Sequence, residues 1–186
     1  MKRIISVLAV VLLLTGCGAK QNAMDRAMAL RSKLQSGKGC SFSAEISADY
    51  TDKIYTFGVQ CDVDAQGNLA FCVRQPQTIA DITGVLSQDG GKLTFDDHVL
   101  VFPMLAEGQV SPISAPWLLY HTLCTGFIRA GEITDPGIHI VLDDSYEENA
   151  VQIDIYTDSE DIPVRGEILW EGRRIVTVMI TDFKIL

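Results

Sequence analysis

Apolar and polar residues alternate with a period of two through most of this chain, and this pattern limits its fold more than any other feature. Successive side chains of a β-strand point to opposite faces, so the alternation predicts strands with one face packed on the core and one face exposed to solvent. Short turns separate the strands, as at Gly67 and Gly90-Gly91, which is typical of an antiparallel meander. The first strand shows the pattern most clearly, because polar residues separate its apolar ones: Phe42, Ala44, Ile46, Ala48 and Tyr50.

The same reasoning predicts about ten strands in all. Two segments have helical spacing instead. Residues 24–35 end at Gly37, and residues 117–128 follow Pro116, where a helix is expected to begin. The second helix has almost no polar face, so it must be buried on most sides or cover an apolar cavity. The expected strands cover residues 42–50, 55–63, 69–73, 79–86, 92–95, 98–102, 137–142, 150–156, 162–170 and 173–184.

The expected fold class is mainly β, of the α+β kind. A meander of this length must bury one apolar face, and the two helices can cover it. We therefore expect a strongly curved antiparallel sheet, an unclosed barrel of about ten strands, with an N-terminal helix and one apolar inserted helix. Residues 24–186 supply enough chain for a single domain of this kind.

The N-terminus predicts where this domain works. Lys2 and Arg3 precede an apolar run at residues 4–14, which is shorter than the about 20 residues that a membrane-spanning helix needs. The run ends in Leu14-Thr15-Gly16-Cys17, with small residues directly before a cysteine. A charged start, a short apolar core and a small-residue cleavage site are typical of a secretory signal.

The cysteine makes this signal resemble the bacterial lipobox. The resemblance implies a signal peptide at residues 1–16, and a Cys17 thiol that carries diacylglycerol and holds the chain to the cell membrane as an extracytoplasmic lipoprotein. Residues 17–23 then form a lipidated tether, and residues 24–186 form the domain. The alternative is an ordinary signal peptide with a chance cysteine.

The charge balance excludes some partners. The signal contains two of the 15 basic residues and none of the 24 acidic ones, which leaves 13 against 24 and a mature net charge of −11. Such a chain has no electrostatic footprint for nucleic acid. It would not be drawn to an anionic membrane by charge either, so the lipid is the expected tether.

Four cysteines remain beyond Cys17, and their spacings do not fit a zinc site. If residues 64–68 form a hairpin loop, Cys61 lies opposite Phe71 and Cys72 points to the other face. Cys40 and Cys61 share a face across the first hairpin, so a disulfide between them is one expectation. Four free buried thiols, with Cys124 as the fourth, are the other.

The sequence contains none of the motifs typical of serine hydrolases, zinc proteases, nucleotide-binding loops or redox-active cysteine pairs. We therefore expect a protein that is not an enzyme and that binds no cofactor and no metal. His98 follows two aspartates, but neighbouring strand residues face opposite ways. His121 is expected in the core of the second helix, and His139 is expected to face solvent. The acidic residues within 143–149 could hold calcium, although a plain acidic hairpin fits their spacing better.

Apolar residues around the second helix are the candidates for a binding site. They could line a pocket for acyl chains, or they could fill the barrel as core, because a pocket needs empty volume as well as apolar walls. The set comprises Met104, Leu105, Trp117, Leu118, Tyr120, Phe127 and Ile128.

Four short segments match motifs of a known family. They are LAFCVRQP at residues 69–76, SQDGGKLTFDD at residues 87–97, DIPVR at residues 161–165 and TDF at residues 181–183. Together they resemble the lipoprotein carriers of the LolA/LolB type. The resemblance covers residues 24–186 in architecture and implies an unclosed barrel that binds a lipid or acyl ligand in its concave face.

The chain departs from the soluble carriers in two ways. It has a lipobox, and residues 56–63 lack the Arg-Pro step whose arginine helps those carriers close. It is more similar to lipid-anchored members in Gram-positive bacteria, such as the germination lipoprotein of spore formers, which binds a partner protein. Two functions therefore stay open. The protein binds a hydrophobic ligand in its concave cavity, or it binds and regulates an envelope protein and its helices fill the barrel as core.

Overall fold

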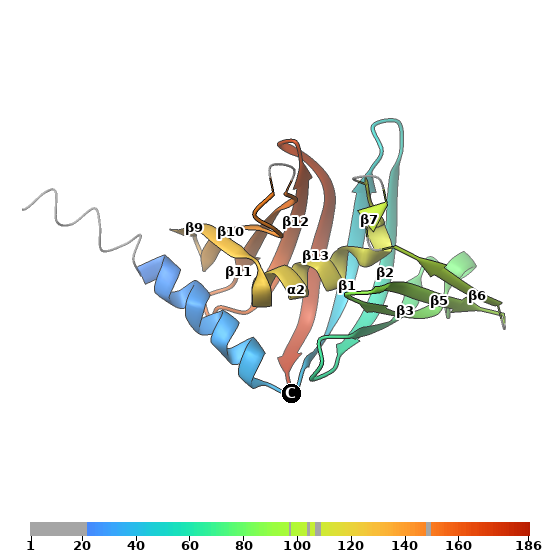
Figure 1. Cartoon of the computed structure of the whole chain (residues 1–186), viewed down its shortest axis with the longest axis horizontal. Helices are drawn as coiled ribbons and strands as arrows, with labels where there is room; N and C mark the ends of the chain where they lie inside the picture. The colour runs from blue at the N-terminus through green and yellow to red at the C-terminus, as the bar shows by residue number, and fades with distance from the viewer. Residues whose placement is uncertain (1–21, 97, 104, 107–108, 148–149) are drawn as a thin grey trace, which may run out of the picture.

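A single antiparallel sheet of eleven strands dominates the computed structural model, which describes residues 22–96, 98–103, 105–106, 109–147 and 150–186 (Figure 1). The predicted class is confirmed: the sheet is curved and unclosed, with an N-terminal helix and one further helix. The signal peptide at residues 1–16, Cys17 and the tether up to residue 21 lie outside the described residues.

The strands lie in the order β6-β5-β4-β3-β2-β1-β13-β12-β11-β10-β9. The first strand and the last strand therefore pair at the middle of the sheet, and both edges come from the interior of the chain. The bounds are β1 (Cys40–Asp49), β2 (Ile54–Val63), β3 (Leu69–Gln75), β4 (Thr83–Ser87), β5 (Gly90–Phe95), β6 (His98–Phe102), β9 (Phe127–Ile133), β10 (Ile138–Asp143), β11 (Gln152–Thr157), β12 (Pro163–Trp170) and β13 (Arg173–Ile185).

Shorter elements connect these strands. A two-stranded ribbon of β7 (Leu105–Ala106) and β8 (Gln109–Val110) leads into the short helix η2 (Pro112–Ser114) and then into α2 (Ala115–Thr125). Residues 79–86, expected as one strand, are the end of η1 (Gln77–Ile79) followed by β4. Asp81 separates the two with a positive φ of 67°, a conformation that a regular strand cannot contain.

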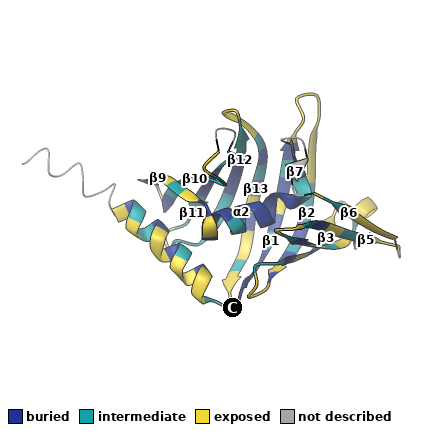
Figure 2. Ribbon diagram, in the orientation of Figure 1, coloured by how far each residue is buried: buried dark blue, intermediate teal, exposed yellow. Residues whose placement is uncertain are grey.

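Both helices cover the concave face of the sheet (Figures 1 and 2). The N-terminal helix, residues 22–36, buries Ala23, Ala27, Leu30 and Leu34, the three-and-four spacing of an amphipathic helix. Arg31 joins the two helices: its Nε donates to the Leu123 carbonyl at 2.6 Å and its Nη2 to the Gly126 carbonyl at 2.8 Å. Leu123 lies in the last turn of α2 and Gly126 follows the helix, so neither carbonyl has a partner within the helix.

The second helix is shorter than expected. It ends at Thr125, and the predicted helical residues Phe127 and Ile128 begin β9 instead. Gly126 marks the change with extended backbone, and a Cβ there would lie 2.4 Å from Thr122 and 2.7 Å from the Asp143 carbonyl. Pairing of Phe127 and Ile128 with β10 therefore overrides the helical pattern of their side chains.

All four described cysteines are free thiols. Cys61 lies opposite Phe71, as predicted, and Cys40 and Cys61 share the packed face. The Cys40–Cys61 disulfide is not formed, and the register shows why: Cys40 lies opposite Val63, and Cys61 opposite Phe42, so the two are diagonal neighbours. Burial raises the pKa of the Cys40 thiol to about 12, which keeps it protonated and unreactive.

Candidate ligand-binding site

Two of the predicted pocket residues lie in the core between α2 and the sheet. Trp117 is 5% exposed, its Nε1–H donates to the Gly67 carbonyl at 3.0 Å, and its ring stacks on His121 with the centroids 4.5 Å apart. Leu118 is equally buried. Burial also lowers the pKa of His121, because the charged imidazolium loses solvation there.

Tyr120 lines the small cavity that remains under α2. This cavity has a volume of about 20 Å³, between Leu119 and Leu123 of the helix and Phe42 and Ile155 of the sheet. A space of this size holds no more than a single water molecule, so the described residues leave no room for an acyl chain beneath α2. Burial raises the pKa of the Tyr120 hydroxyl, which therefore stays neutral.

The other predicted residues lie elsewhere. Phe127 is half-exposed on the edge strand β9, where its ring lies 5.5 Å from that of Tyr146, and Ile128 packs against the core opposite Leu142. Leu105 belongs to the short strand β7, and Met104 lies outside the described residues. The structure does not bring the predicted set together around one cavity.

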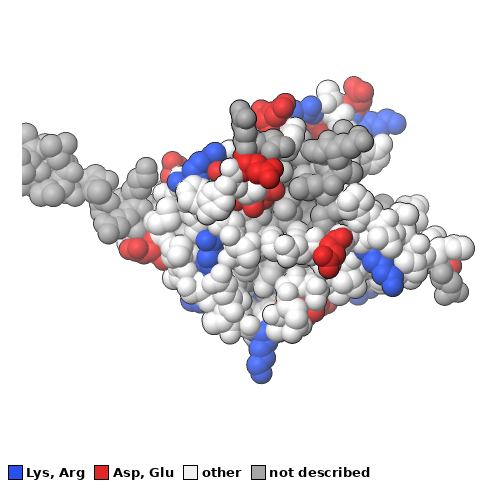
Figure 3. Space-filling view, in the orientation of Figure 1, with Lys and Arg blue, Asp and Glu red and all other residues white. Residues whose placement is uncertain are grey.

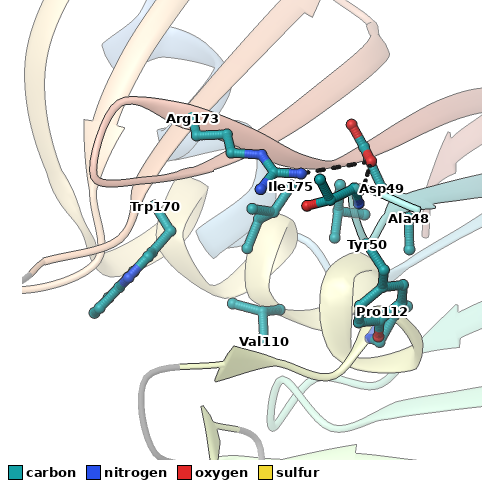
Figure 4. Close-up of a pocket in the computed structure, with 10 residues that line it drawn as sticks. Ala48, Asp49, Tyr50, Val110, Pro112, Trp170, Arg173 and Ile175 are labelled. Carbon is teal, nitrogen blue, oxygen red and sulfur yellow. Dashed lines mark hydrogen bonds and ion pairs between the residues drawn. The ribbon is translucent and has the colours of Figure 1, made fainter. Parts of the chain in front are cut away.

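A larger pocket opens at one end of the barrel, where β1 ends and β13 begins (Figure 4). Its volume is about 350 Å³, within the range of small-ligand sites. We call it the rim pocket. Its walls come from four parts of the chain: Ala48, Asp49, Tyr50 and Thr51; Val110 and Pro112; Trp170; and Arg173, Ile175 and Val176.

Strand pairing builds the floor of the rim pocket. Ala48 lies opposite Val176 between β1 and β13, and both are buried. Trp170 lies opposite Arg173 across the β12–β13 turn, where Glu171 and Gly172 both have positive φ, as a tight two-residue hairpin requires. The turn thus holds an indole and a guanidinium at the pocket mouth.

An ion pair lies across the rim of this pocket. Arg173 Nη2 is 3.5 Å from Asp49 Oδ1, and the same carboxylate oxygen accepts the Thr51 N–H at 2.8 Å (Figure 4). Both charged side chains are half-exposed, so water screens their attraction and the pair can be exchanged at little cost. Arg173 can therefore turn to an anionic group on a ligand.

The lining of the rim pocket combines apolar, aromatic and charged side chains. Val110, Pro112 and Ile175 supply apolar surface, and Tyr50 and Trp170 supply aromatic rings with a polar atom each. Its lining has no histidine, cysteine or serine that could act as a nucleophile with a base. Across the described part of the chain, no group of three or more His, Cys, Asp or Glu side chains could hold a metal ion.

A charged network occupies the opposite face of the sheet, on β10 to β13. His139 was expected to face solvent, and this prediction is wrong: its side chain is 16% exposed, stacks on Tyr156, and lies 3.3 Å from Asp154. Asp154 and Glu167 are direct cross-strand neighbours, an unfavourable arrangement that nearby cations offset. We interpret this network as structural, because each acid has a basic partner: His139 for Asp154, and Arg165 and Arg174 for Glu167.

Charges of both signs are scattered over the face that carries α2 (Figure 3). The acidic loop expected as a plain hairpin joins β10 to β11, and Asp144 Oδ1 accepts the Val151 N–H at 2.8 Å there. No helix in the described residues is both long enough and apolar enough to cross a bilayer.

The residues of the rim pocket were missed at the sequence level. The turn at Glu171-Gly172 is visible in the sequence and places Trp170 opposite Arg173. Asp49 joins them only through the pairing of β1 with β13, which lie at opposite ends of the domain in sequence. A tryptophan beside a predicted tight turn was the one available signal.

Solved structures share this fold at low sequence identity. A DUF1329 family protein from Desulfovibrio piger has a TM-score of 0.50 and 8% identity, over 90% of this chain and 93% of that chain. A putative outer membrane lipoprotein-sorting protein domain from Vibrio parahaemolyticus has a TM-score of 0.50 and 9% identity, over 89% and 92%. A LolA superfamily protein from Nitrosomonas europaea has a TM-score of 0.46 and 8% identity, over 86% and 93%.

The two neighbours with a TM-score of 0.50 show the fold alone, and this fold agrees with the unclosed barrel that the sequence predicted. The finer likeness to the germination lipoprotein stays a prediction. No protein-family model matches the sequence, and no curated protein matches it.

Proposed function

We propose that this protein is a membrane-anchored extracytoplasmic lipoprotein that binds a hydrophobic ligand, a lipid or acyl chain, in the rim pocket. The observation that carries the proposal is the pocket itself: about 350 Å³ of space with apolar and aromatic walls, against about 20 Å³ beneath α2. The carrier-like fold and the lipobox at Cys17 support it. The ligand site is thus moved from the face of α2 to the end of the barrel.

The walls fit a ligand with an apolar body and a polar head. Val110, Ile175 and the Trp170 ring can cover a hydrocarbon segment, whose transfer from water stabilises the complex by about 0.8 kcal/mol per buried methylene. Arg173 lies at the mouth, where a carboxylate or phosphate head could replace Asp49 as its partner.

Brominated fatty acid can locate the ligand, because bromine quenches a nearby tryptophan and the chain has two. Trp117→Phe leaves Trp170 at the pocket, and Trp170→Phe leaves Trp117 buried under α2 as the matched control. We expect quenching in residues 18–186 carrying Trp117→Phe and little in those carrying Trp170→Phe. The reverse pattern would put the ligand under α2, and no quenching in either variant would contradict ligand binding.

Native mass spectrometry of the same protein, purified from bacteria without detergent, gives an independent readout. Extra mass that is released on denaturation as a fatty acid or phospholipid supports a lipid ligand. A mass equal to that of the chain alone counts against one. The anchor is tested separately by labelling cells with palmitate: we expect label on the full chain and none on Cys17→Ser.

A second function has its own supporting observation. The end of the sheet at β6 exposes Val99, Leu100 and Val101, a surface more typical of protein contacts than of an isolated domain. We therefore keep the alternative that the protein binds and regulates an envelope protein, with α2 filling the barrel as core. Crosslinking in cells would support it if a partner were captured at β6 and lost when Val101 is replaced by lysine.

A further inference from the structure

Strand β6 is an open edge of the sheet without the usual protection. Its three central residues are 55% (Val99), 60% (Leu100) and 74% (Val101) exposed. Natural sheets block such edges with charged side chains, proline, bulges or covering elements, because free backbone groups pair readily with another strand. Within His98–Phe102 there is no proline, no register shift against β5 and no charged residue type other than His98, although Pro103 follows the strand directly. No other described strand pairs with β6 on its free side.

The other edge of the same sheet, β9, is protected in three ways. It carries Arg129 and Glu132, its register against β10 shifts between Val141 and Leu142, and the N-terminal helix packs beside it, where Ala23 lies against Gly131. Because one edge of this sheet is protected and the other is not, the exposure of β6 is a property of that edge and not of the fold.

The sequence of β6 is nearly symmetric about Leu100, since valines flank it on both sides. β5 and β6 pair Phe95 with His98 next to their turn, and Leu93 with Leu100. In a tight hairpin the pair beside the turn shares hydrogen bonds, and the pattern alternates along the strand. Val99 and Val101 therefore direct their backbone N–H and C=O groups to the free edge.

We propose that β6 pairs with β6 of a second copy of this chain, antiparallel and about a two-fold axis at Leu100. In this register Val99 lies opposite the partner's Val101, and the backbone N–H of each residue donates to the backbone C=O of the other. Leu100 meets the partner's Leu100 at the axis, on the same face as Leu93. The two sheets become one continuous sheet, and the backbone N–H and C=O groups of Val99 and Val101 are hydrogen-bonded in both copies.

Charge limits where a second copy can approach. The chain from Cys17 onward has a net charge of −11, so two copies repel one another over most of their surface. His98–Phe102 contains no acidic or basic residue other than His98, which lies opposite the partner's Phe102 in this register. The uncharged edge is therefore where two acidic copies can approach without placing like charges opposite each other.

The area involved predicts a weak dimer. Five residues of edge bury less than the about 800 Å² per partner that a standard stable interface needs. Pairing in dilute solution is then marginal. The lipid anchor, which belongs to the proposed function, would hold copies on one membrane face at a far higher effective concentration.

Cysteine crosslinking in the full chain tests the register directly. In a Cys72→Ser background, which removes the partly exposed thiol, we introduce Leu100→Cys, Val99→Cys or Val101→Cys and oxidise intact cells. At the axis the two new thiols of Leu100→Cys face each other within disulfide reach, whereas two copies of Val99→Cys are diagonal. We expect about tenfold more covalent dimer for Leu100→Cys than for Val99→Cys alone.

Co-expression and a matched control complete the test. Val99→Cys and Val101→Cys expressed together should crosslink, although each alone does not, because these residues are opposite one another in the register. Val85→Cys, exposed on the interior strand β4, should stay monomeric. Absence of dimer for Leu100→Cys, equal dimer at all four positions, or crosslinking of β6 only to a different protein would each overturn the proposal. None of these outcomes bears on ligand quenching at Trp170.

Discussion

The two halves of the sheet are built from the same kind of strand but have opposite surroundings. In the covered half, β9 to β13, both helices lie on the concave face, and Ile138, Ile140 and Leu142 are fully buried (Figure 2). In the wing, β4 to β6, no helix in the described residues covers that face, and the apolar side chains of β6 are exposed. The covered half therefore has a continuous buried face, whereas the wing has more exposed apolar surface, although Leu86 on β4 is fully buried.

Aromatic side chains cover two glycines of the wing, one from Phe71 on the adjacent strand β3 and one from Phe102 on β6. A Cβ on Gly84 would lie 2.5 Å from the Phe71 ring, and a Cβ on Gly91 would lie 2.3 Å from the Phe102 ring. The rings thus lie directly on the backbone of the neighbouring strand and shield it from water. The comparison teaches that one part of a sheet can pack against the core, as Leu86 and Leu93 do, while its outermost strand stays exposed.

One substitution at two leucines tests this comparison most strongly. Leu142→Ala removes a fully buried side chain from β10 in the covered half, and we expect it to lower the free energy of unfolding by about 3 kcal/mol. Leu100→Ala, on β6, should cost less than about 0.5 kcal/mol because the side chain is already in water. Urea unfolding followed by circular dichroism measures both. Similar losses in the two variants would mean that the wing is part of the core.

Arg31 tests whether the two helices cover the sheet as one unit. Arg31→Ala leaves the end carbonyls of α2 without their guanidinium, and we expect a loss of about 1 to 2 kcal/mol in the free energy of unfolding. Arg31→Lys should recover little of it, since an ammonium cannot reach Leu123 and Gly126 together. Arg74→Ala, beside the wing, removes only an exposed 4.0 Å ion pair and serves as the matched control. A loss no larger than that of the control would refute the bridging role.

Local elements could be predicted from the sequence because their causes are local. The alternation in β1 and the turn at Gly67 set the strand and its register, and Cys61 duly lies opposite Phe71. Amphipathic spacing gave the N-terminal helix within two residues of its described start. These features depend on neighbours a few positions away, which the sequence displays directly.

The site could not be predicted in the same way, because its causes are long-range. Asp49 and Arg173 meet only once β1 pairs with β13, and no periodicity encodes that contact. An apolar helix looks the same whether it lines a void or fills one, so the sequence of α2 could not reveal that Trp117 and Leu118 are core. His139 failed for a related reason: strand alternation correctly put it on the outer face, but its neighbours on β11 and β12 bury that face.

The pH dependence of stability at His121 gives the smallest expected effect and tests the same comparison of the covered half with the wing. His121 lies in the covered half, where burial lowers its pKa below the ordinary 6.5, and Asp144 offsets this only in part. The unfolded chain then takes up the proton more readily, so the stabilisation is present above pH 6.5 and is lost as pH falls through the folded-state pKa. Between about pH 7.5 and about pH 5.5, the parent should lose more stability than His121→Gln, by less than about 1 kcal/mol. Leu100→Ala in the wing, which removes no titratable group, should follow the parent; if it departs from the parent as much as His121→Gln does, burial of His121 under α2 is not the cause.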